Sequence, residues 1–266
     1  MATKGDPMNP SNVQIRVPGE EKNLALAIGQ GHGVNRLLAA LPPDLVEHLG
    51  SDLQLISLAQ GSVLFEPGEP IEHVYFPQSG LISLLVISRD GDAIETAIIG
   101  REGAVGLHRA FGERRSFTRA IVQVAGHFST IAADKFELAI GASAAAREAI
   151  TDYTELLWAE CQQLAACNAV HDAASRLCRS LLQSADRAGS DQLTLTQESL
   201  SIALGVRRTS VTLLAQTLQK KGMIRYSRGV IQILDRPRLE TCACECYHVM
   251  RDESLSTALG LRLERR

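Results

Sequence analysis

The sequence predicts an α+β protein in which an antiparallel β domain precedes a long helix and a helical C-terminal domain. Three observations predict this order. Short β-type runs separated by turns fill residues 53–132, a stretch rich in Ala, Leu and Glu follows at 143–168, and two shorter helices flank a glycine within 193–218. The 266 residues, 45% of them hydrophobic and 21% charged, suit one large domain or two ordinary ones.

Before the β domain, residues 1–33 hold three prolines, five glycines and scattered polar residues, which predicts a disordered lead-in. A short helix is expected over 35–41, where Pro42-Pro43 stops it, and a second one over 44–49.

Seven short runs, each bounded by turn residues, predict an antiparallel sandwich or barrel. Arg89-Asp90-Gly91-Asp92 is typical of a hairpin turn, because glycine tolerates the positive φ that tight turns need. The predicted strands are 53–58, 62–65, 73–76, 81–88, 93–99, 119–124 and 128–132.

Helical patterns fill the second half of the chain, at 134–140, 143–168 and 169–187. Apolar residues recur along the middle helix with an imperfect heptad spacing, which is typical of a dimer seam. The same spacing also fits an amphipathic helix that packs on its own sheet. The seam residues would be Ile150, Tyr153, Leu157 and Leu164.

The segment 193–218 has the layout of a helix-turn-helix. Thr194 or Thr196 can cap its first helix, and Gly205 stands where a tight turn needs a positive φ. Arg207 or Arg208 then opens a second helix whose first turn carries groups that hydrogen-bond base edges and phosphates. The predicted contacts on this helix are Arg207, Arg208, Thr209, Ser210 and Thr212.

A β-hairpin is expected after the second helix, with strands at 223–226 and 230–234, and such a hairpin forms a wing. Arg228 at its tip and Gln197 on the first helix are expected to contact phosphate. The charge distribution agrees: residues 170–234 carry nine Lys/Arg against four acids, in a chain whose net charge is −3. A basic block in an acidic chain favours a polyanion partner, here double-stranded DNA, although a solvated charged face gives the same bias.

Taken together, this order of elements resembles the Crp/Fnr family of bacterial transcription regulators. Gly61-x-x-Leu64-Phe65-x-x-Gly68-Glu69 and Tyr75-x-x-x-x-Gly80 are similar to the early strands of a cyclic-nucleotide-binding-like domain. The resemblance implies a double-stranded β-roll, a dimerising helix and a winged helix-turn-helix, and it favours the dimer seam. The implied division is a lead-in (1–33), a β-roll sensor domain (34–141), a dimerisation helix (142–168), a DNA-binding domain (169–236) and a C-terminal extension (237–266).

The residues that read DNA in the family are assigned to this sequence position by position. The family's guanine-reading Arg matches Arg208, whereas Thr209 and Leu213 stand where family members often have Glu and a second Arg. The operator is therefore expected to differ from the common family consensus.

The effector site departs further from the family. Members that bind cyclic nucleotides carry a Gly-Glu pair and an Arg-Ser/Thr-Ala motif; here the corresponding residues are Gly106-Leu107 and Arg115-Ser116-Phe117. The carboxylate is missing and a bulky Phe replaces a small residue, so the effector is unknown and not expected to be cyclic AMP. No cofactor is predicted.

Near the C-terminus, Cys242, Cys244 and Cys246 alternate along the chain, followed by His248. These are zinc or copper ligand types, but the spacing is not Cys-x-x-Cys. In a helix Cys242 and Cys246 would share a face while Cys244 points away, and two thiolates with His248 would then need a second chain or another region to complete a metal site. Free thiols are the other interpretation.

The expected function is a homodimeric, sequence-specific DNA-binding regulator in the cytoplasm, working with RNA polymerase. Neither a membrane span, a signal peptide nor a catalytic motif is recognised in the sequence, so an enzyme is not expected. The alternative is a signalling adaptor, responsive to a small molecule, metal or redox change, that uses its winged helix for protein contacts.

Overall fold

The computed structural model describes residues 15–16, 35–107 and 115–251. Seven strands form the β domain, and all seven predicted runs are confirmed as strands, with ends that shift by at most two residues. They are β2 (Gln54–Leu58), β3 (Val63–Phe65), β4 (His73–Pro77), β5 (Leu81–Ile87), β6 (Ala93–Ile99), β7 (Arg119–Val124) and β8 (Gly126–Ala132).

These strands form two antiparallel sheets, in the orders β2-β8-β4 and β3-β7-β5-β6, which make the two halves of a β-roll. Apolar side chains from both sheets meet between them, among them Ile56, Ile82, Val122 and Phe128. Alternation along each strand places one face in this core.

A further strand, β1 (Ile15–Arg16), pairs with β2 and adds an edge to the first sheet. The prediction of a disordered lead-in was therefore wrong for these two residues, and the other residues of 1–33 lie outside the described part.

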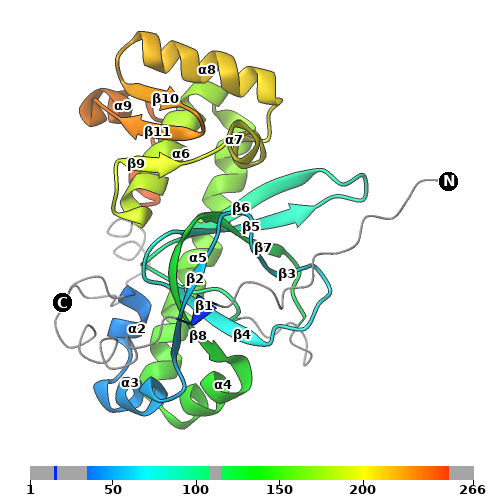
Figure 1. Ribbon diagram of the computed structural model, residues 1–266, viewed down its shortest axis with the longest axis vertical. Coiled ribbons are helices and arrows are strands. Elements are labelled where there is room, and N and C mark those ends of the chain that lie inside the picture. The colour runs from blue at the N-terminus through cyan, green and yellow to red at the C-terminus, as the bar shows by residue number, and fades with distance from the viewer. Residues whose placement is uncertain (1–14, 17–34, 108–114, 252–266) are drawn as a thin grey trace.

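Helices cover one end of the roll and continue into the C-terminal domain (Figure 1). Polar N-caps start several of them; Ser143, for example, accepts a hydrogen bond from the Ala146 amide at 3.2 Å. The helices are α2 (Arg36–Ala40), α3 (Pro43–Gly50), α4 (Ala133–Ala142), α5 (Ala144–Val170) and α6 (Ala173–Ala188).

The C-terminal domain has its own apolar core around α6. Leu177 and Leu181 of α6 are fully buried there, together with Leu239 and Tyr247 from beyond residue 236. The predicted boundary at 236 was wrong in this respect, because the C-terminal extension contributes core residues. The elements of this domain are β9 (Gln192–Thr194), α7 (Gln197–Leu204), α8 (Arg208–Lys220), β10 (Ile224–Ser227), β11 (Val230–Ile233), α9 (Arg236–Cys242) and α10 (Cys246–Val249).

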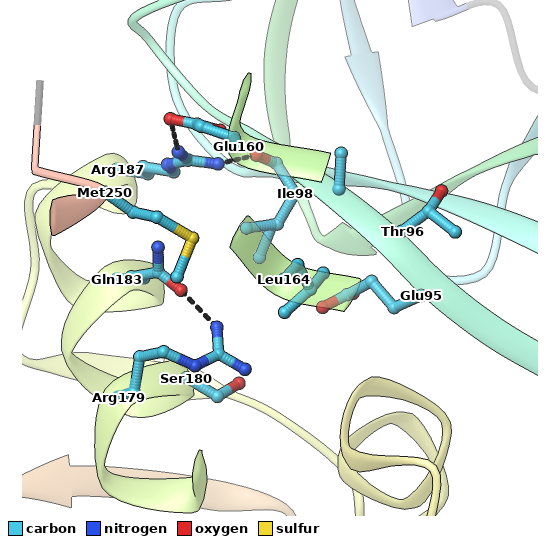
Figure 2. A pocket seen from close by; sticks show the side chains of 11 residues that line it. Glu95, Thr96, Ile98, Glu160, Leu164, Arg179, Ser180, Gln183, Arg187 and Met250 are labelled. Carbon is cyan, nitrogen blue, oxygen red and sulfur yellow. Dashed lines mark hydrogen bonds and ion pairs between the residues drawn. The ribbon is translucent and has the colours of Figure 1, made fainter. Parts of the chain in front are cut away.

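The β-roll and the C-terminal domain meet where α6 ends (Figure 2). Arg187 of α6 is buried there, and its guanidinium donates to the carbonyl of Ile98 in β6 and to the carboxylate of Glu160 in α5, the latter at 2.6 Å. A Cβ on Gly100 would lie 2.7 Å from the Cβ of Arg187, so only glycine permits this close approach. One arginine thus joins the roll, the long helix and the C-terminal domain.

Candidate nucleic-acid interface

Helices α7 and α8 form the predicted helix-turn-helix. Thr196 caps α7 by accepting a hydrogen bond from the Ser199 amide at 3.0 Å, whereas Thr194, the other candidate cap, lies in β9 and pairs with Val230. Gly205 ends α7 in the left-handed conformation, with φ 60° and ψ 36°, as the turn requires.

The inner face of α8 fixes which residues point outward. Val211, Ala215 and Leu218 are buried against the core of the C-terminal domain, and Val206 is half-buried in the angle between the two helices. Because a helix repeats every 3.6 residues, burial of this stripe leaves the opposite stripe of α8 in solvent (Figure 1).

The beginning of α8 presents the predicted contact residues. Arg207, Arg208 and Thr209 are exposed, and no side chain caps the helix. Ser210 and Thr212 are half-buried, and the Thr212 hydroxyl donates to the Arg208 carbonyl at 3.1 Å. The free amides at a helix start attract anions, so this end suits a phosphate-bearing partner.

Two residues that were not singled out as contacts continue the outward stripe of α8. Leu213 is 65% exposed and Gln216 is exposed one turn further along. An apolar side chain can contact a thymine methyl, and Gln can bond adenine through two hydrogen bonds. Their spacing of four and then three residues from Thr209, which keeps them on one face of a helix, is the sequence signal that could have identified Leu213 and Gln216.

The wing is a three-stranded sheet in the order β10-β11-β9, of which β9 was not predicted. Arg228 and Gly229 form its tip, both with positive φ (50° and 78°). This conformation costs a non-glycine residue about 1 kcal/mol or more, and it holds the exposed Arg228 at the apex. Gln197 is half-buried at the start of α7.

Next to Gln197, Tyr226 of the wing lies close to α8. Burial raises the pKa of Tyr226, while the charge of Arg208 and a backbone hydrogen bond with Gln197 oppose the rise. The wing and the starts of both helices therefore converge at this tyrosine.

The basic block divides into two groups. Arg176, Arg179 and Arg187 are buried in structural contacts; the Arg176 guanidinium, for example, donates to the Leu204 carbonyl at 3.0 Å. The exposed positive charges all lie on α8, its flanks and the wing, with Glu198 as the one acid in 192–234. They are Arg207, Arg208, Lys220, Lys221, Arg225 and Arg228.

Two of the candidate effector residues, Arg115 and Ser116, donate hydrogen bonds to backbone carbonyls of the roll. The Ser116 hydroxyl donates to the Thr118 carbonyl at 2.5 Å, and an Arg115 guanidinium nitrogen donates to the Gly68 carbonyl at 2.9 Å. Gly106 has φ +91°, and a Cβ there would lie 2.4 Å from the His73 carbonyl oxygen. Leu107 packs partly against the helical end of the roll. The connecting residues 108–114 lie outside the described ranges.

The predicted dimer seam faces the chain's own β domain. Tyr153 is buried, and its hydroxyl donates to the Ala104 carbonyl at 2.9 Å and accepts from the Ala104 amide. Ile150 and Leu157 pack on the same core, and Leu164 lines the cavity between α5 and α6 in Figure 2. The assignment of Tyr153 to a seam between chains was therefore wrong, because the heptad pattern marks a buried face without specifying what buries it.

The cysteine run is not one helix, as the predicted face-sharing required. Cys242 ends α9 against the core of the C-terminal domain, whereas Cys244 and Cys246 point together toward Cys167 and His171. His248 is exposed and lies outside that group. In the described part of the chain, no helix combines the length and apolar character needed to cross a membrane.

Comparisons with known proteins agree with this architecture. Residues 55–141 match the cyclic nucleotide-binding domain family, and residues 175–242 match the Crp-like helix-turn-helix domain family. No curated protein sequence matches the chain.

Among solved structures, FixK2 from Bradyrhizobium japonicum is similar with a TM-score of 0.63 at 17% identity, over 72% of this chain and 98% of FixK2. A transcriptional regulator of the Crp/Fnr family from Eubacterium rectale gives a TM-score of 0.59 at 19% identity, over 77% of this chain and 96% of that one. The c-di-GMP-responsive regulator CLP from Xanthomonas campestris gives a TM-score of 0.56 at 15% identity, over 72% of this chain and 99% of CLP. With both family domains present in this order around one long helix, the chain belongs to the Crp/Fnr family of transcription regulators.

Proposed function

We propose that the chain is a homodimeric regulator that reads a near-palindromic DNA site through the start of α8. The observation that carries this proposal is the gathering of every exposed positive charge of 192–234 around α8 and the wing. Among them, Arg207 and Arg208 supply the charge that a helix entering the major groove with its first turn needs at its N-terminal end.

Within this interface, Arg208 is assigned to base reading. It is the first residue of α8 and it is exposed, and two parallel hydrogen bonds from Arg to guanine are the commonest specific contact. Thr209, Leu213 and Gln216 extend the reading surface along the helix, while Gln197, Tyr226 and Arg228 contact phosphate beside it.

The dimer forms along the face of α5 that points away from the roll. Exposed residues recur there at alternating spacings of four and three residues, which is the spacing of a coiled-coil seam. Trp158, 66% exposed, is the largest side chain in this stripe. The stripe consists of Thr151, Glu155, Trp158, Gln162, Ala165 and Ala169.

A dimer built this way places two α8 helices on successive major grooves, with half-sites about 34 Å apart. Contact with RNA polymerase stays a prediction from the family. The contacts of Arg115 and Ser116 with neighbouring backbone support a roll that does not take cyclic AMP through these residues.

The test is a selection of genomic DNA fragments with purified protein at physiological salt, repeated with Arg208→Ala. The wild-type protein should enrich an inverted repeat, and Arg208→Ala should lose preference at one symmetric position in each half-site. Recovery of fragments without any shared motif would refute sequence-specific reading.

A further inference from the structure

Four metal-ligand side chains meet where the long helix joins the C-terminal domain. Cys167 lies in the last turn of α5, and His171 lies in the connection between α5 and α6. Cys244 lies between α9 and α10, and Cys246 is the first residue of α10. One ligand atom from each of the four lies within 4.8 Å of all the others. The group thus combines residues that are 77 positions apart in the sequence.

The spacing of these atoms fits a single tetrahedral ion. The Cys167 and Cys244 sulphurs are 3.5 Å apart, and the Cys246 sulphur is 3.6 Å from Nδ1 of His171. Zinc bonds of about 2.3 Å to sulphur and about 2.0 Å to nitrogen give tetrahedral sulphur–sulphur and sulphur–nitrogen separations of roughly 3.8 and 3.5 Å. Small side-chain adjustments therefore suffice to place all four ligands on one ion.

The imidazole is oriented for coordination. Nε2 of His171 lies 3.0 Å from a carboxylate oxygen of Glu245, which favours the proton on Nε2 and leaves the lone pair of Nδ1 facing the sulphurs. Carboxylates hold metal-binding histidines in this manner. Nε2 of Gln163 also donates to the Cys246 sulphur at 3.1 Å, a contact that stabilises a thiolate.

The group is largely buried, and a positively charged side chain nearby can balance the negative charge of a zinc–thiolate site. The three cysteines of the group, Cys167, Cys244 and Cys246, are buried and pack together with Met250. Zinc with three thiolates carries a net charge of −1, and the buried Arg179 guanidinium lies close enough to act electrostatically on Cys167 and Cys244. Nε of Arg179 has no hydrogen-bond partner within the described residues.

We propose that Cys167, His171, Cys244 and Cys246 bind one zinc ion. The ion links the end of α5, the connection to α6 and the C-terminal segment, and so fixes how the C-terminal domain is held on the long helix. A single ion is favoured over an iron–sulfur cluster, because a cluster spreads its protein ligands over two or more irons, whereas one atom from each of these four residues lies within 4.8 Å of all the others.

The test measures metal in the full chain, purified in a reducing buffer without chelator. We expect about one zinc per chain by mass spectrometry, and tetrahedral ligand-field bands with sulphur-to-metal charge transfer when Co²⁺ replaces it. Cys244→Ser and Cys246→Ser should lose the zinc. Cys242→Ser, a half-buried cysteine of the same run outside the group, should keep it. Glu245→Gln should weaken zinc binding about 10–100-fold.

Several outcomes would overturn the proposal. They are wild-type protein that takes up no stoichiometric zinc or Co²⁺, equal zinc in Cys244→Ser and wild type, stoichiometric iron with inorganic sulfide, and a Cys167–Cys244 disulfide in protein kept reduced. If Cys244→Ser does not fold by circular dichroism, the Co²⁺ spectrum of the wild-type protein decides the matter alone. None of these readouts depends on DNA binding.

Discussion

The guanidinium of Arg187 donates to the carboxylate of Glu160 at 2.6 Å, and both side chains are about nine-tenths buried. Glu102 lies 3.4 Å from the same guanidinium, and the Ile98 carbonyl accepts from it as well. The buried guanidinium of Arg187 thus contacts β6, α5 and the segment that follows β6. Figure 2 shows its contacts with Ile98 and Glu160. This network contributes to the placement of the roll against the C-terminal domain, together with the contacts of α7 with β6.

Replacing Arg187 with Met should lower the free energy of unfolding by about 3–5 kcal/mol, because it leaves buried carboxylates without their cation. Urea unfolding measures the loss. Arg119→Met is the matched control: its pair with Glu66 is about one-third exposed, so the loss should be about 1 kcal/mol or less. Equal losses in the two variants would contradict the role given to Arg187.

Glu95 gives a prediction on pH. Burial raises the pKa of this carboxyl, against the lowering effects of a hydrogen bond from Ser83 and of the charges of Arg179 and Arg187. Between the ordinary glutamate value and the raised one, the folded state holds more protons than the unfolded state, so this group contributes less stability as pH rises. Glu95→Gln should therefore gain stability relative to the wild type as pH rises above about 4.3.

Urea unfolding of both proteins across a pH series measures this difference, and it should level off once the folded carboxyl has ionised. Glu47→Gln, on the exposed face of α3 and outside the proposed dimer stripe, is the control and should differ little from the wild type at any pH. A Glu95→Gln difference that shrinks as pH rises would show that the buried carboxylate is stabilising.

Arg208→Ala tests base reading. Binding to the preferred site should weaken by about 1–3 kcal/mol per half-site, with discrimination lost at one base pair. Lys220→Ala, at the other end of α8, should at most weaken binding to all sequences alike and reduce the salt dependence by about one charge. Fluorescence anisotropy with single-base variants of the site separates the two effects. A uniform weakening by Arg208→Ala would make Arg208 a phosphate contact.

Trp158→Glu tests the α5 face. A charge in the centre of the seam should convert a dimer into a monomer in analytical ultracentrifugation. Leu138→Glu, which changes an 80% exposed side chain on α4, should leave the dimer intact. If both variants sediment like the wild type, the dimer forms elsewhere.

The local features of the fold could be predicted from the sequence. Alternating apolar residues located the strands, and Gly205 located the turn before α8, since both signals act over a few residues. The face of α5 that forms a dimer could not be predicted. Burial of Tyr153 against the chain's own Ala104 and burial against a second chain produce the same spacing of apolar residues.

Contacts between residues far apart in the sequence could not be predicted, for a related reason. The sequence showed the alternating Cys242, Cys244 and Cys246, but it gave no sign that Cys167 and His171 lie beside two of them. Likewise, the charge count treated Arg187 as part of a basic surface, whereas it is buried in a structural network. In both cases tertiary packing decides the role of the residue.

Sequence-specific reading by α8 is tested most directly by the ratio of affinities for a selected site and for scrambled DNA of the same length, measured at physiological salt. We expect a ratio of about 10³ or more for the wild-type dimer, falling by at least tenfold in Arg208→Ala. A wild-type ratio near one, with binding that only follows salt concentration, would contradict sequence-specific recognition by α8.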